Sequence, residues 1–63
     1  MTQIAVVKQK STGLYLRMSK FDPDTQKPIY GALDMAWIAH SLAQAEAQAT
    51  FFGDADHIGC VEN

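Results

Sequence analysis

The sequence predicts a small α+β domain, in which an antiparallel sheet of three or four strands has one helix packed on a face. Two observations lead to this prediction. The stretch SLAQAEAQATFFG, from Ser41 to Gly53, contains the start signal, body and stop signal of one helix. The stretches before and after it have the composition and alternation of strands. The predicted order is β-β-(β)-(β)-α-β, in a single domain of residues 1–63.

The helix is predicted from its two ends. The Ser41 hydroxyl can accept a hydrogen bond from the first turn, and Gln44, at the third helical position, can reach back to complete a capping box. Leucine, alanine, glutamine and glutamate between the ends are good helix formers. Gly53 is placed to end the helix in the left-handed conformation.

A hairpin is predicted at the beginning of the chain. Ile4–Gln9 is β-branched and apolar, which favours a strand, and residues 10–13 form a turn in which Gly13 can take a positive φ. Leu14–Met18 alternates with period two, as a half-buried strand does. Its two predicted faces are Leu14, Leu16 and Met18 on one side, and Tyr15 and Arg17 on the other.

The middle of the chain is predicted to be irregular. Ser19–Lys27 is a polar loop, with a turn at Asp22-Pro23-Asp24 and with Phe21 as an anchor to the core. The remaining predicted elements are an edge strand at Pro28–Gly31, a helical turn at Leu33–Ala36, a strand at Trp37–His40 and a final strand at His57–Glu62.

The predicted helix has two apolar stripes, although one helix on one sheet needs only one. At about 100° per residue, the first stripe, expected on the sheet, is Leu42, Ala45, Ala49 and Phe52. The second stripe is Ala43, Ala47 and Phe51. We expect the second stripe to make a homodimer contact; the alternative is that Phe51 folds over the helix end and covers a loop. Trp37 and Tyr30 are further interface candidates, and Trp37 is otherwise a core residue.

The charge is distributed unevenly along the chain. Five basic and two acidic residues in the first 27 positions give +3, and five acidic residues without a basic one thereafter give −5. Cys60 is the only cysteine, which excludes a disulfide within the monomer and fits a reducing compartment. No apolar run is long enough to span a membrane, and no signal peptide precedes the first strand. We therefore expect a cytoplasmic protein that does not contact membranes.

No spacing in the sequence predicts a catalytic or metal site. The residues that might ligate a metal are His40, Asp54, Asp56, His57 and Cys60, and they form no CxxC, HxxxH or HExxH pattern. Cys60 could pair with a histidine as a nucleophile, but a cysteine within a strand is more often structural. We therefore expect a protein that is not an enzyme and needs no cofactor or metal.

Binding of single-stranded nucleic acid is the alternative function. Basic residues on the hairpin would meet phosphates, and an aromatic ring among them would stack on a base. The candidate residues are Lys8, Lys10, Tyr15, Arg17 and Lys20. Against this alternative stand the single aromatic residue on the hairpin and the acidic isoelectric point of about 5.4.

Three segments between Lys10 and Asn63 form a pattern: the hairpin KSTGLYLR, the stretch ALDMAWIAHSLAQAEAQA and the closing HIGCVEN. This pattern resembles small proteins of unassigned function encoded by phages and prophages. The resemblance implies an accessory protein that binds host or viral components, and it carries over no functional residue. The sequence thus predicts a small non-enzymatic binding or regulatory protein that acts through protein–protein contacts.

Overall fold

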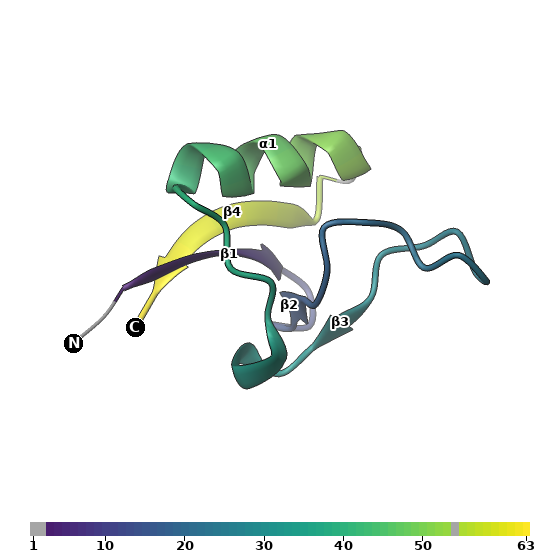
Figure 1. The fold of residues 1–63 in the computed structure, drawn as a ribbon, viewed down its shortest axis with the longest axis horizontal. Helices are drawn as coiled ribbons and strands as arrows, with labels where there is room; N and C mark the ends of the chain where they lie inside the picture. The colour runs from purple at the N-terminus through teal and green to yellow at the C-terminus, as the bar shows by residue number, and fades with distance from the viewer. Residues whose placement is uncertain (1–2, 54) are drawn as a thin grey trace.

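The computed structural model describes residues 3–53 and 55–63 as a four-stranded antiparallel sheet with one α-helix over one face (Figure 1). In chain order the elements are β1 (Ile4–Gln9), β2 (Tyr15–Leu16), β3 (Tyr30–Gly31), the 3₁₀ turn η1 (Leu33–Met35), α1 (Leu42–Phe52) and β4 (His57–Glu62). The predicted α+β class and the order of elements around the single helix are confirmed.

The first and last strands of the chain lie side by side. The order in the sheet is β3-β2-β1-β4, so β4 forms one edge and β3 the other. β1 and β4 pair along their whole length, from Ile4 opposite Glu62 to Gln9 opposite His57. Both strands have the bounds that their β-branched and apolar composition predicts. The described ends of the chain consequently lie close together (Figure 1).

The predicted hairpin is confirmed, but its second strand is shorter than predicted. Gly13 takes a φ of 72° in the turn, and Lys8 pairs with Tyr15. The strand β2 covers only two residues, so the prediction of a strand over Leu14–Met18 is wrong at both ends. Leu16 is fully buried, whereas Leu14 and Met18 are 41% and 36% exposed.

The reason is that β2 has two different neighbours. The Leu16 carbonyl accepts a hydrogen bond from the Trp37 N–H, at 2.8 Å, and the Arg17 N–H donates to the Ile29 carbonyl, at 2.9 Å. The pairing of β2 with β1 therefore stops at Tyr15, and residues 37–39 take the place of β1 beside Leu16. Local alternation cannot reveal this replacement, because the new neighbour is about 20 residues away.

Residues 37–40 do not form the predicted strand. Only Ala39 makes a bridge, to Ala5 of β1, and its N–H donates to the Ala5 carbonyl at 2.9 Å. The 3₁₀ turn η1 before it is confirmed. The predicted edge strand within Pro28–Gly31 is also confirmed, as the two residues of β3.

The helix has the caps that its sequence predicts. The Gln44 N–H donates to the Ser41 hydroxyl at 3.2 Å, and the Gln44 side chain accepts from the His40 N–H, one residue before the position that a capping box uses. Gly53 ends the helix with a φ of 69°. One member of the predicted core stripe is wrong: Leu42, the first residue of the helix, is 40% exposed.

The core lies between α1 and the sheet and is made of small and β-branched residues. Its buried members are Val7, Leu16, Ala39, Ala45 and Ala49, with Ala5, Tyr30, Trp37 and Phe52 packed around them. Trp37 and Tyr30 are thus half-buried and pack against the core, as the core alternative for Trp37 predicted, and their part in an interface stays a prediction.

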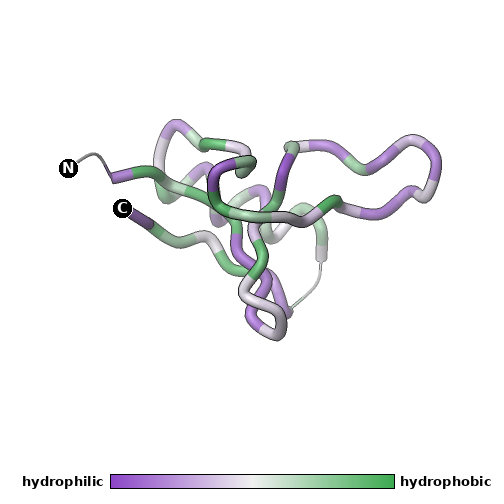
Figure 2. Tube along the Cα trace, turned by 90° about the horizontal axis from the view of Figure 1, so that it is seen from below, coloured by the Kyte–Doolittle hydropathy of each residue, from purple (hydrophilic) through white to green (hydrophobic). Residues whose placement is uncertain are grey.

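The loop between β2 and β3 projects from the domain, and Figure 2 shows that its far end is mostly hydrophilic. The Asp22 carboxylate accepts hydrogen bonds from the backbone and the hydroxyl of Thr25, as the predicted turn requires. Phe21 anchors the loop as predicted, since its ring meets that of Phe52 edge-on at 4.8 Å. Gln48 of α1 also donates to the Ser19 carbonyl, at 2.8 Å.

Candidate functional site

The outer edge of β4 presents backbone groups that have no partner within the sheet. The Lys10 N–H donates to the Asp56 carbonyl at 2.7 Å, which makes these two opposed residues a hydrogen-bonded pair. Because such pairs alternate along an antiparallel ladder, Ile58, Cys60 and Glu62 direct their backbone groups toward β1. The backbone groups of His57, Gly59 and Val61 therefore point away from the sheet.

The edge of β4 lacks the usual protection of an exposed strand. Natural sheets blunt their edges with very short strands, prolines, lysines or bulges. The other edge follows this rule, since β3 has two residues. β4 has six residues, HIGCVE, with neither proline nor lysine, and in the described residues no hydrogen-bond partner takes its three outward-facing residues. It is therefore an available template for another strand.

A groove of about 670 Å³ runs between this edge and the helix. Its lining comes from the C-terminal half of α1, the chain that follows it and the first half of β4: Glu46, Ala49, Thr50, Gly53, Ala55, His57, Ile58 and Gly59. On the helix, Glu46 and Thr50 lie one turn apart on the side next to Ala45 and Ala49, which face the core. They therefore overhang the position that an additional strand would occupy.

Gly59 determines how close the helix comes to β4. A Cβ atom added at Gly59 would lie 2.5 Å from the backbone nitrogen of Glu46 and 2.8 Å from the carbonyl carbon of Ala45. No side chain fits in that space, so the backbone of α1 rests directly on the strand. The buried alanines on the same helix face permit this approach. The close approach places the groove at the edge of the strand rather than above its middle.

Aromatic rings surround His57, which is one of the residues that line the groove. His57 is 8% exposed, and its imidazole stacks on Tyr30 with ring centres 5.0 Å apart and meets Phe52 at 6.0 Å. Burial lowers the pKa of His57. Neither imidazole nitrogen has a hydrogen-bond partner in the described residues, and the buried Tyr30 hydroxyl also has none. The neutral imidazole is therefore the form that this site accommodates.

A polar cluster occupies the face of the sheet away from the helix. The Tyr15 hydroxyl donates to the Glu62 carboxylate at 2.8 Å, and the Lys8 ammonium lies 3.6 Å from that carboxylate and 5.7 Å from the Tyr15 ring centre. The hydrogen bond to Glu62 raises the pKa of Tyr15. Burial, and then the Glu62 charge, raises the pKa of the Cys60 thiol, so this cysteine is a poor nucleophile at neutral pH.

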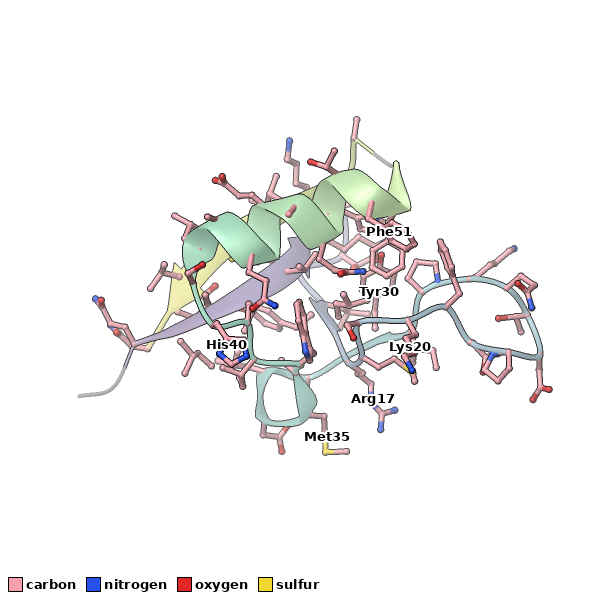
Figure 3. All side chains as sticks on the ribbon, turned by 45° about the horizontal axis from the view of Figure 1, so that its top comes forward. Arg17, Lys20, Tyr30, Met35, His40 and Phe51 are labelled. Atoms are coloured by element: carbon pink, nitrogen blue, oxygen red, sulfur yellow. The ribbon has the colours of Figure 1, made fainter. Side chains whose placement is uncertain are left out.

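The structure brings only part of the predicted nucleic-acid surface together. Lys8 and Tyr15 share the face away from the helix, but both are bound to the Glu62 carboxylate. Arg17 points away from α1, and Lys20 lies in the projecting loop (Figure 3). Lys10 is in the exposed hairpin turn. A carboxylate at the centre of this surface opposes phosphate binding.

The predicted second stripe of the helix faces solvent. Ala43 and Ala47 are exposed, and Phe51 is 65% exposed at the C-terminal end of α1 (Figure 3). Phe51 also contacts Phe21 of the projecting loop, with ring centres 5.7 Å apart. Phe51 thus contacts the loop, as the alternative predicted, and leaves most of its surface exposed; the homodimer contact stays a prediction.

Among the described residues, no group of three or more histidine, cysteine, aspartate or glutamate side chains is placed to hold a metal ion. Of the metal ligands considered from the sequence, Asp54 lies outside the described residues. In the same part of the chain, no helix has the length and apolar character needed to cross a bilayer. No protein-family profile, no curated protein and no solved structure matches this chain.

Sequence reasoning did not predict the β4 edge as a site. The strand itself was predicted, with the bounds that the structure has. Whether a strand lies inside a sheet or at its edge depends on which strands pair, and β4 pairs with a strand about 50 residues earlier. The available signal was the absence of proline and lysine from a strand that proves to be an edge.

Proposed function

We propose that this protein is a non-enzymatic binding protein that acts through protein–protein contacts, and that the outer edge of β4 is its binding site. One observation supports this proposal: three alternate residues of β4 point their backbone groups outward beside an open groove under α1. In β-augmentation, a partner strand gains affinity from main-chain hydrogen bonds and selectivity from pockets for alternate side chains. An edge flanked by a helix supplies both.

The first test uses a neutral strand as the probe. The blocked heptapeptide Thr-Val-Thr-Gln-Thr-Val-Thr is titrated into the isotopically labelled protein, and backbone amide shifts are followed. We expect the largest shifts at His57, Gly59 and Val61, because their N–H groups would acquire acceptors. The fully N-methylated peptide is the control. It keeps the side chains but has no backbone N–H donors, so the amide shifts should be much smaller.

The matched variants are Val61→Pro and Val61→Ala. Proline at an outward-facing edge position removes a donor without breaking the ladder to β1, so Val61→Pro should lose peptide binding while the remaining amide spectrum stays dispersed. Val61→Ala keeps the N–H and should retain binding. Shifts confined to Ala43, Ala47 and Phe51, or to the hairpin, would overturn the proposed site.

Self-association through the second helix stripe is an additional proposal, supported by the 65% exposure of Phe51. A homodimer would cover Ala43, Ala47 and Phe51 together. Sedimentation equilibrium at high protein concentration tests it, since Phe51→Ser should remove any dimer that uses this stripe. The nucleic-acid alternative, the phage resemblance and the cytoplasmic location stay predictions.

A further inference from the structure

Resting on the proposed function, we infer that the segment which pairs with β4 is an extended basic stretch of another protein, and not a second copy of this chain. The side chain of Glu46 supplies the chemistry. It lies over Gly59, since a Cβ atom there would be 2.7 Å from its Cγ atom. The carboxylate thus lies on the groove side of the helix, beside the strand edge.

Among the described residues, no ion pair to Glu46 is observed. All five lysines and arginines lie between residues 8 and 27, and none follows. The ion pair observed among the described residues joins Lys8 to Glu62 on the other face of the sheet. A partner strand is therefore the natural source of the cation. Residues directly opposite each other in an antiparallel pair point to the same face, so a lysine opposite Gly59 would project toward Glu46.

The groove also defines the neighbours of that lysine. Residues two positions away on the added strand project to the same face, opposite His57 and Val61. One of them meets the groove under Ala49 and Thr50, and the other meets the exposed side chains of Val61 and Leu42. Both positions suit a medium apolar side chain. The preferred partner is consequently an alternating stretch with an apolar, a basic and an apolar residue on one face.

A second copy is a poor occupant of this edge. The two-fold register that pairs all three outward residues places Gly59 opposite Gly59 of the partner copy. Adjacent strands lie about 4.8 Å apart, whereas packed helices need about 8–10 Å between axes. The backbone of α1 rests on Gly59, so the two helices would be crowded. The two Glu46 carboxylates would also meet near the two-fold axis, where like charges repel.

The test compares three peptides that differ at one position: Thr-Val-Thr-Xaa-Thr-Val-Thr with Lys, Gln or Glu at the centre. Dissociation constants come from the amide shifts of His57, Gly59 and Val61. We expect the Lys peptide to bind about fivefold more tightly than the Glu peptide, since an exposed charge pair contributes up to about 1 kcal/mol. In Glu46→Gln, the dissociation constants of the three peptides should lie within about twofold of one another, and molar salt should have the same effect on the unchanged protein.

Each outcome is decisive. Equal binding of the three peptides at β4 overturns the basic preference and leaves the proposed function standing. Absence of any shift at β4 with all three peptides overturns both. Shifts of the outward amides that grow with protein concentration alone, and disappear in Val61→Pro, would identify a second copy as the occupant. Asp34→Asn is the control variant, because it removes an exposed carboxylate outside the groove and should leave the peptide order unchanged.

Discussion

Strands β1 and β4 pair over all six of their residues, whereas β2 and β3 pair over two. The two halves of the sheet also pack against side chains of different size. Under α1, a glycine and two alanines let the helix backbone rest on β4. At the C-terminal end of the helix, rings fill the space, with Tyr30 of β3 on His57 and Phe21 of the projecting loop on Phe52. Small residues permit regular, closely spaced backbones, while large ones hold irregular chain in place through side-chain packing.

This difference explains where the binding edge lies. The regular half ends in an edge of six residues with a helix beside it, and the irregular half ends in an edge of two residues. Leu16 joins the two halves, because it belongs to β2, pairs with β3 and packs beneath α1. Substitutions on either side of this junction therefore test whether the two halves are held together in different ways.

The largest expected effect is at the junction. Leu16→Ala removes a fully buried side chain and should lower the free energy of unfolding by about 3 kcal/mol, from the lost burial and the cavity that remains. Leu14→Ala, two residues away and 41% exposed, should cost less than about 0.5 kcal/mol. Urea unfolding followed by Trp37 fluorescence measures both. Equal losses would mean that the two halves do not share Leu16 as a core residue.

The close approach of α1 and β4 is tested by Gly59→Ala. The added methyl group meets helix backbone, which cannot rotate away, so we expect a loss of about 2 kcal/mol from overpacking. Gly13→Ala is the matched control, since its positive φ costs about 1 kcal/mol while nothing lies within 4 Å of the new atom. If calorimetry finds Gly59→Ala the milder change, the helix is not held by this contact.

The smallest expected effect is the pH dependence of folding stability that arises from His57, whose ring packs on Tyr30. Because burial lowers the pKa of His57 in the folded protein, the unfolded chain binds the proton more readily. Stability should therefore be unaffected by His57 above about pH 6.5 and should fall as pH drops below it, by at most about 1.4 kcal/mol per pH unit. Thermal unfolding between pH 7.5 and 5 measures this loss. His57→Phe should remove this loss of stability at low pH. If the variant keeps the same pH profile, the loss comes from other groups.

Local signals predicted much of this fold. The helix was predicted from Ser41, Gln44 and Gly53, and the structure has these caps with their hydrogen bonds. The strand bounds of β1 and β4 followed from short runs of β-branched and apolar residues. The misjudged elements, the ends of β2 and the segment 37–40, depend on one another. Each was predicted as a regular strand, and each is interrupted by a neighbour distant in sequence.

The elements of the candidate site were likewise predicted one by one, but not how they come together. Glu46, Thr50 and the residues of β4 were each placed on the correct element, but their meeting was not predicted. The second helix stripe was predicted to be surplus to folding, and its exposure is observed. Whether it contacts another chain depends on a partner, which no pattern within one chain identifies.

Local signals in the sequence were enough to predict three elements: one capped helix, a hairpin with a glycine turn, and an apolar final strand. These signals are set by neighbouring residues through backbone conformation and side-chain capping. Three further outcomes required the tertiary structure. The last strand pairs with the first and thereby becomes an edge, and Leu16 is buried while Leu14 is not. The backbone of α1 also packs directly on Gly59. Those outcomes depend on which distant segments compete for the same backbone groups, and that competition is resolved only when the chain folds as a whole.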